Sequence, residues 1–295
     1  MANLVNKFAK YIGKLDTVYK QAAKTAILDG DNQLVKMGTN AGEFKIPMLD
    51  MDGLGDYDRN GGYASGSVSI TYQTRMADYD RGRKFDVDAM DNEETAGLLF
   101  AKLASEFVRT KAVPELDAYR FAKYASIPGV TKVSAALGTG IEVLEAIRKA
   151  KTDMDEAEVN SEGRVLFITP TALDAAKNVN TNISKDVLNA FEIVPVPQSR
   201  FYTGISLRDG RSDDELEGGY VPAEGTYPIN FMVVEKSAII QFTKHNVNKV
   251  ITPEDNQTSD SWLFFYRAYG IADHYDNKTS GIYVHHSATP YVKAD

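Results

Sequence analysis

The feature that most constrains the fold is one long helical pattern, which ends near Tyr124. Asp91 and Glu94 have the D-x-x-E spacing of a capping box, so the helix is predicted to begin near Asn92. Pro114 disfavours helical backbone at the residue before it, so the helix either kinks there or restarts with Pro114 in its first turn. At 1.5 Å per residue the element would be roughly 50 Å long, which is typical of a strut. Apolar residues recur at three- and four-residue steps behind the cap: Ala96, Leu99, Phe100, Leu103, Phe107 and Val108.

A long β-hairpin is predicted before this helix, within residues 43–88. The run EFKIPML predicts one strand, and SVSITYQTRM, which alternates Val68, Ile70 and Tyr72 with polar residues, predicts another. Between them, GLGDYDRNGGYASG has the composition of a turn. An isolated hairpin is marginal in water, and this one has few large apolar residues near its tip. We therefore expect another chain to stabilise it.

The rest of the chain mixes helices and strands. Thr139 and Glu142 form a second capping box, and RVLFITP (164–170) predicts a short strand followed by a helix over 171–178. Residues 229–243 predict a strand pair around Lys236 and Ser237, and two more strands are expected at 262–269 and 281–286. These interspersed and partly segregated elements predict an α+β fold.

Residues 1–28 form an amphipathic basic arm, with five lysines between apolar residues at helical steps and Asp16 as the single acid. Such an arm could lie on anionic lipid, on nucleic acid or on a neighbouring subunit. We favour packing against protein, because a charged face is ordinary on a surface helix.

Composition narrows the function classes. The net charge of −8 argues against a protein that wraps nucleic acid with its whole surface. The absence of cysteine excludes disulfides, thiolate metal sites and cysteine nucleophiles, and it suits assembly in a reducing cytoplasm. The first residues have no continuous apolar segment of the signal-peptide kind, and no stretch reaches membrane-spanning length. No membrane contact is therefore expected.

Motifs for cofactor and metal binding are incomplete. The pair of glycines in residues 138–140 is followed by Val143 where a dinucleotide fingerprint needs a third glycine. Residues 56–61 (DYDRNG) match the first half of a calcium loop, but Ser67 stands where the bidentate Glu is required. Neither a cofactor nor a metal is expected.

The histidines do not form a catalytic pattern either. Neighbouring side chains of a strand point to opposite faces, so His285 and His286 would not share one metal ion. Asp273 and His274 could be two thirds of a hydrolytic triad, but no serine is placed to complete it. We expect no catalytic residues.

Short blocks spread over roughly residues 43–286 carry a family resemblance. The first are DYDR (56–59), RGR (81–83) with Phe85, Asp88, Asp91 and Glu94-Thr95, EFVR (106–109) and PELDAYR (114–120). The later ones are RVLFIT (164–169), VPQSRFY (196–202), INFM (229–232) and GIYV (281–284). In this order they resemble the major capsid proteins of tailed double-stranded DNA bacteriophages.

The resemblance implies the HK97-type coat fold. Residues 1–42 would be the N-terminal arm, 43–88 an extended hairpin called the E-loop, and 89–129 the part of the peripheral domain that holds the spine helix. Residues 130–250 would be the axial domain, and 251–295 would return to the peripheral domain as strands. The strut helix and the unpartnered hairpin agree with this interpretation.

The implied function is structural. Hexamers and pentamers of the chain would close into an icosahedral shell around the phage DNA, without sequence-specific binding, after assembly in the bacterial cytoplasm. A portal protein and a separate scaffolding protein would be partners, and a decoration protein is left open. The residues that we expect at subunit contacts are Tyr57, Arg59, Arg75, Arg81, Glu106 and Arg109. The alternatives are an encapsulin-like compartment for protein cargo and a soluble α+β enzyme with an unrecognised site.

Two departures from the family pattern add expectations. About 42 residues precede the E-loop, too few for the large scaffolding segment that some relatives remove, so scaffolding should be a separate protein or absent. Relatives that join subunits by isopeptide bonds carry the lysine on the E-loop. Here Lys45 and Lys84 lie near its base and the tip over 53–66 has none, so a non-covalent shell is expected.

Overall fold

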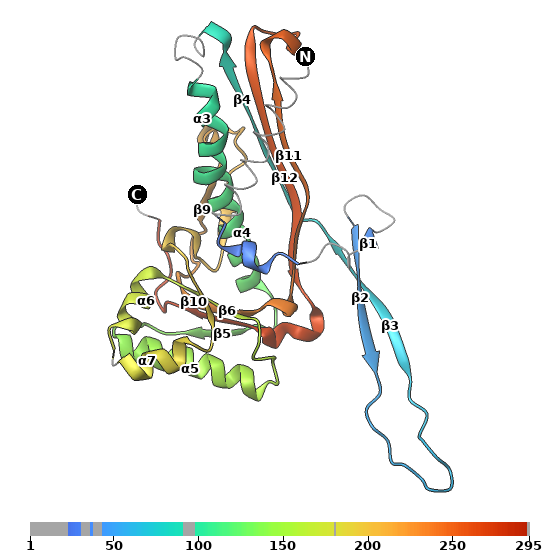
Figure 1. Cartoon of the computed structure of the whole chain (residues 1–295). Helices are drawn as coiled ribbons and strands as arrows, with labels where there is room; N and C mark the ends of the chain where they lie inside the picture. Colours follow the sequence, from blue (N-terminus) through green and yellow to red (C-terminus); the bar gives the residue numbers. More distant parts are fainter. Residues whose placement is uncertain (1–22, 31–35, 38–42, 91–97, 180, 294–295) are drawn as a thin grey trace.

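The computed structural model describes residues 23–30, 36–37, 43–90, 98–179 and 181–293 (Figure 1). Most of the predicted basic arm lies outside these residues, as does the predicted capping box of Asp91 and Glu94.

The spine of the molecule is one continuous helical column. It consists of α3 (Leu98–Phe107), a π-helical turn η3 (Val108–Ala112) and α4 (Val113–Ser126). Pro114 lies in the first turn of α4, as one of the two predicted alternatives requires, but the helix does not stop before it: Val113 keeps helical backbone (φ −66°, ψ −47°) and the π-helical turn η3 carries the column through. The column ends at Ile127, whose extended backbone is what a following proline imposes.

A three-stranded antiparallel sheet runs along the spine. Its order is β11 (Ile239–Ile251), β12 (Ser261–His274) and β4 (Tyr79–Asp88). Buried Val108 and Leu116 of the helix pack against Phe264 and Tyr266 of β12. The predicted strut is therefore a helix supported along its length by a sheet (Figure 1).

A five-stranded sheet forms the second core, in the order β5 (Thr131–Ser134), β13 (Ile282–His286), β10 (Ile229–Glu235), β6 (Arg164–Ile168) and β7 (Glu192–Pro195). Val165 and Phe167 share a core with α4, whereas Leu166 and Ile168 face the helices α5 (Gly140–Glu156), α6 (Pro170–Lys177) and α7 (Thr181–Leu188). Helices thus cover both faces, which explains why β6 is buried throughout. The predicted capping box of Thr139 and Glu142 opens α5 and is confirmed.

The predicted strand pair around Lys236 and Ser237 is wrong. β10 pairs with β13 and β6, while β11 pairs with β12, so the two strands belong to different sheets. A 3-10 turn η6 (Lys236–Ala238), in which the Glu235 side chain accepts the N–H of Ser237 at 3.0 Å, directs the chain from one sheet to the other. The turn has none of the Asn-Gly or Gly-Gly chemistry that would fold the two strands back on each other.

The hairpin is formed by β2 (Glu43–Met51) and β3 (Val68–Met76), with the short β1 (Lys36–Met37) on the outer edge of β2. Its turn and the far ends of its strands extend away from the body (Figure 1), while Phe44 and Ile46 near its base are buried against β11 and β12. Its pairing ends at Met76, and the following β4, which sequence analysis placed in the same region, belongs to the sheet beside the spine. A smaller hairpin, β8 (Ile205–Leu207) with β9 (Tyr220–Pro222), carries the loop 208–219.

The 3-10 helix η1 (Thr25–Leu28) fastens the described part of the arm to the spine. The fully buried carboxylate of Asp117 accepts the N–H of Lys24 at 2.9 Å and both the N–H and the hydroxyl of Thr25 at 3.1 and 2.7 Å. Arg200 lies 3.1 Å from the same carboxylate. A buried carboxylate thus has several donors, as its burial requires.

Candidate assembly surface

Large apolar side chains are exposed mainly on the hairpin. Of the thirteen that are exposed among the described residues, nine lie between Leu49 and Met76: Leu49, Met51, Leu54, Tyr57, Tyr63, Val68, Ile70, Tyr72 and Met76. Scattered exposed apolar residues are ordinary on a protein surface, but a contiguous group of them marks an interaction site. Only three of the nine, Leu54, Tyr57 and Tyr63, lie at the tip over 53–66, and the other six lie on the two strands.

The strand register gathers five of these residues on one face. Leu49 stands opposite Ile70, Met51 opposite Val68, and Pro47 opposite Tyr72. Directly opposed residues of an antiparallel pair share a face, and the side chains of Leu49, Met51, Val68, Ile70 and Tyr72 are 51–70% exposed. We call these five residues the apolar face.

The body of the same chain packs on the other side of the hairpin. Phe44 and Ile46, whose side chains alternate with those of the apolar face, are buried against Ile240, Phe242 and Ile271 of β11 and β12. The rings of Phe44 and Phe242 meet edge to face, 4.7 Å apart. Because side chains alternate along a strand, the apolar face points away from this contact. Its own subunit covers the base of the hairpin and leaves the apolar face open.

The tip of the hairpin is a compact turn. Asp58 and Gly62 exchange two backbone hydrogen bonds, and the Asp58 carboxylate accepts the N–H of Asn60 at 3.0 Å. Gly62 has φ of +80°, a conformation that glycine adopts without strain. The rings of Tyr57 and Tyr63 lie 4.9 Å apart, and both are exposed. Arg59 of the predicted contacts is exposed in the same turn.

Within the partial calcium motif over 56–61, the Asp58 carboxylate accepts a hydrogen bond from inside the turn itself. Within the described ranges, no three histidine or carboxylate side chains are placed to hold a metal ion.

Two of the arginines predicted at subunit contacts are held within their own chain. Arg75 lies 3.0 Å from the Asp273 carboxylate and also pairs with Asp276. Arg81 lies 2.7 Å from Glu115 of the spine and donates to the carbonyl of Arg208 at 2.7 Å. Arg75 therefore fixes the base of the hairpin, and Arg81 joins β4, the spine and the loop 208–219.

The remaining predicted pair lies on the surface of the spine, where Glu106 also lines the open cleft beside β4. Arg109 donates to Glu106 at 2.7 Å, one helical turn away, and both side chains are more than half exposed. An exposed pair at this spacing contributes only about 0.3–0.5 kcal/mol to the free energy of folding. The two side chains can thus rearrange to meet another molecule at little cost. Tyr57 and Arg59 at the hairpin tip are separate from this pair.

The histidines suspected of chemistry have structural partners. His274 lies 3.0 Å from its neighbour Asp273, whose second oxygen faces Arg75. His285 is buried, stacks on Phe231 and lies 3.1 Å from the side-chain amide of Asn230. Burial, together with the nearby His286, lowers the pKa of His285 to about 4.

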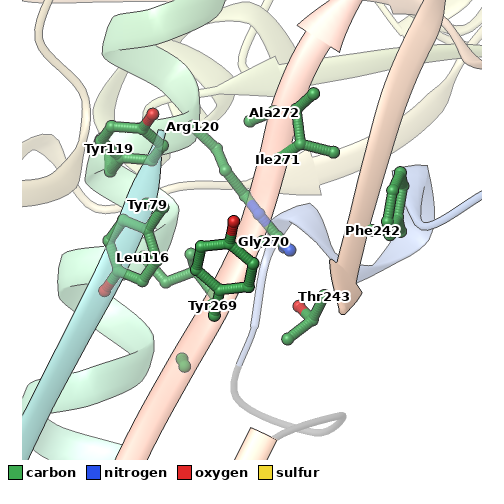
Figure 2. Close-up of a pocket in the computed structure, with 11 residues that line it drawn as sticks. Tyr79, Leu116, Tyr119, Arg120, Phe242, Thr243, Tyr269, Gly270, Ile271 and Ala272 are labelled. Carbon is green, nitrogen blue, oxygen red and sulfur yellow. The ribbon is translucent and has the colours of Figure 1, made fainter. Parts of the chain in front are cut away.

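Two cavities are candidate ligand sites. A cavity of about 10 Å³ between α4, β4 and β12 is lined by Tyr79, Leu116 and Arg120 (Figure 2), and it is too small for more than one water molecule. An open cleft of about 980 Å³ lies between the spine, β4 and the loop 208–219. In this cleft the Ser212 hydroxyl and the N–H groups of Arg211 and Ser212 lower the pKa of Asp209 to about 2, so this carboxyl group serves its own turn.

Among the described helices, none is long and apolar enough to cross a membrane.

Among known proteins, only solved structures are similar to this chain. No protein-family model matches the chain, and no curated protein matches it. Among solved structures, one from Mycobacterium phage Che8 is similar with a TM-score of 0.55 at 14% identity, over 86% of this chain and 89% of that chain. The mature capsid of bacteriophage PhiM1 gives a TM-score of 0.56 at 12% identity, over 85% of this chain and 83% of that one.

A virus-like particle from Pyrococcus furiosus is similar over 93% of this chain and 98% of that chain, with a TM-score of 0.54 at 10% identity. Likenesses at such low identity establish the fold. The chain therefore has the α+β HK97-type coat fold that the sequence resemblance implied.

Proposed function

We propose that this protein is the major capsid protein of a tailed bacteriophage and that its copies assemble into an icosahedral shell around double-stranded DNA. The observation that carries the proposal is the apolar face, which its own subunit leaves uncovered. A second copy is the natural cover, because a shell protein meets itself at every contact and symmetry repeats each contact around the shell. The fold of the similar phage structures supports the same conclusion.

The contacts would have two parts. The apolar face would bury its five side chains against a neighbouring copy, with Tyr57 and Arg59 at the tip reaching further. Glu106 and Arg109 on the spine would supply exchangeable ionic contacts. Arg75 and Arg81 would act from within, by positioning the hairpin and the loop 208–219. The five ranges predicted from the sequence remain our proposed division into arm, E-loop, peripheral and axial parts.

The partners are also proposals. Hexamers and pentamers would form with a separate scaffolding protein, and a portal protein would occupy one vertex. Assembly would take place in the bacterial cytoplasm, and the mature shell would be part of the virion. The net charge of −8 suits a container that must not bind its DNA tightly. The role would be structural rather than catalytic.

Electron microscopy of the purified chain, expressed alone and with the scaffolding candidate, tests the proposal. Closed uniform shells or capsomer rings are the expected result, and a small monodisperse oligomer under both conditions would contradict it. Boiling the particles in SDS should release single chains, because the hairpin tip has no lysine for an isopeptide bond. A ladder of covalent oligomers would refute the non-covalent shell.

A protein-filled compartment is the second candidate, and the similarity to the virus-like particle over 93% of this chain favours it. The contents of isolated particles separate the two functions. Nuclease-protected DNA of phage length supports the capsid, and a cargo protein without DNA supports the compartment.

A further inference from the structure

The joint between the hairpin and the body has an apolar part, an ionic part and one buried hydrogen bond, which the Gln73 side chain donates to the carbonyl of His274 at 3.3 Å. In the apolar part Phe44 and Ile46 are buried against β11 and β12. In the ionic part Arg75, which stands opposite Phe44 in the strand register, meets two carboxylates. The two parts therefore lie side by side at the base of the hairpin.

The ionic part is directional. The Arg75 guanidinium lies between Asp273, near the end of β12, and Asp276, at the start of the 3-10 helix η8 (Asp276–Gly281). The Asp273 carboxylate is fixed in turn, since its other oxygen accepts the N–H of His274 at 2.9 Å. The Arg75 guanidinium donates a hydrogen bond to Asp276, whose side chain is about half exposed, and its Nε faces Asp273 as an ion pair without hydrogen-bond geometry. A planar guanidinium between two carboxylates of the body still has fewer favourable orientations than an apolar contact, which is non-directional.

The chain that leaves the hairpin is fixed at a second point, because Asp78 lies 2.5 Å from Lys123 of α4. A rotation of the hairpin about this point would separate Arg75 from its two carboxylates. Each hairpin strand has nine residues, about 30 Å at 3.3 Å per residue, so a rotation of about 10° would move the far end of the strands by about 5 Å. A small change at the joint is therefore a large change at the apolar face.

We propose that Arg75 is a latch that fixes the angle between the hairpin and the body, and that this angle sets the curvature of the assembled shell. The link between the hairpin angle and shell curvature rests on the proposed function, whereas the role of Arg75 in fixing the angle does not. When a contact is repeated by symmetry, the angle at which one copy presents its face to the next decides whether and at what size the assembly closes. A loosened latch would permit several angles and hence several sizes.

Distance measurement on unassembled subunits tests the latch. The chain has no cysteine, so Ser65→Cys at the tip and Lys149→Cys on α5 give two unique sites for spin labels, both exposed. In the parent we expect a narrow distribution of label-to-label distances. Arg75→Gln should broaden and shift the distribution, and Arg75→Lys, which keeps the charge but loses the planar fork, should broaden it less.

A matched control is Arg267→Gln. Arg267 of β12 forms a close pair with Asp80 of β4, at 2.8 and 2.6 Å, so this pair lies within the sheet beside the spine and not between the hairpin and the body. It should leave the distance distribution unchanged. An unchanged distribution in Arg75→Gln, or equal broadening in both variants, overturns the latch.

Microscopy of assembled particles tests whether the hairpin angle sets the curvature of the shell. Arg75→Gln shells should show a wider range of diameters than parent and Arg267→Gln shells. Uniform diameters in a variant with a broadened distance distribution would overturn the link to curvature and leave the latch standing. If the parent forms no shells, the proposed function fails, and the distance measurement still decides whether Arg75 is a latch.

Discussion

Replacing one residue of the apolar face should block assembly and leave the subunit folded. Ile70 lies at the centre of that face, opposite Leu49, and is 61% exposed in the single subunit. Full burial of an isoleucine side chain contributes about 1.5–3 kcal/mol, so covering the exposed part of Ile70 would contribute about 1–2 kcal/mol at each contact. Ile70→Asp removes this contribution and adds a buried unpaired carboxylate, whose cost is at least another 1–3 kcal/mol.

The sum is about 3 kcal/mol for each contact, and every 1.4 kcal/mol is tenfold in an equilibrium constant. The concentration at which shells first form should therefore rise about a hundredfold. Light scattering over a concentration series measures this threshold. Urea denaturation of the unassembled subunit checks the fold. The free energy of unfolding should change only slightly, because Ile70 is an exposed strand position in the single subunit.

Thr71→Asp is the matched control. Thr71 is the next residue of the same strand, is exposed on the opposite face and has Met48 as its partner. It carries the same charge and the same loss of strand propensity as Ile70→Asp, so its threshold should stay near that of the parent. Equal thresholds for Ile70→Asp and the parent would refute the argument, and so would an equal rise in both variants.

Three further predictions concern the subunit alone and are measured by denaturation. Phe121→Ala should lower the free energy of unfolding by about 3–5 kcal/mol, because this fully buried ring joins the spine to the five-stranded sheet. Asp117→Ala should cost a similar amount, about 3–5 kcal/mol, since it leaves Arg200 and the donors of Thr25 without their acceptor. The pKa of His285 is lowered from its ordinary value near 6.5 to about 4, so between these two pH values His285 is protonated in the unfolded chain and neutral in the folded chain. Its contribution to stability should therefore be complete above pH 6.5 and decline as the pH falls to about 4, and His285→Gln should flatten the profile in that window.

Each of these predictions has an outcome that contradicts it. Tyr63→Ala, an aromatic truncation at the exposed tip, should cost little, and a loss equal to that of Phe121→Ala would mean that burial does not determine the effect. Asp117→Ala should also make the chain near Lys24 more accessible to trypsin, because Asp117 accepts the N–H of that residue. An unchanged digestion pattern would argue that other contacts hold the arm. For His285 the decisive quantity is the difference in the free energy of unfolding between parent and His285→Gln at each pH, since the carboxylates that titrate in both proteins cancel. A difference that does not change between pH 6.5 and about 4 would contradict the prediction.

Local patterns in the sequence predicted those elements that local chemistry determines. The capping box at Thr139, the place of Pro114 in the first turn of a helix and the buried run of β6 all appear where predicted, since each depends on residues within one or two turns or a single strand. The pairing of β10 and β11 was predicted wrongly, because strand partners are chosen by burial between distant segments. β10 joins β13 and β6, and β11 joins β12.

The candidate site was predicted in part. The alternation of Val68, Ile70 and Tyr72 was visible in the sequence and predicted a strand with one apolar side. That this side faces away from the body follows only from the packing of Phe44 and Ile46 on β11 and β12. In the same way, the sequence identifies Arg75 and Arg81 as charges near the hairpin and cannot show that Asp273 and Glu115 hold them. Those pairs join residues that are 198 and 34 positions apart, and no periodic pattern connects them.

The division of the hairpin into two faces separates folding from assembly. The face with Phe44 and Ile46 is buried when the subunit folds, so the base of the hairpin is attached to the body before any neighbour arrives, and Arg75 in our proposal fixes its angle. Fixing a mobile segment at an interface costs about 0.5–1.5 kcal/mol for each flexible side chain and more for a free loop. A hairpin held at its base avoids part of this cost, and weak contacts can then suffice for association. Since weak contacts also dissociate, a subunit added at a wrong angle can leave before the shell closes around it.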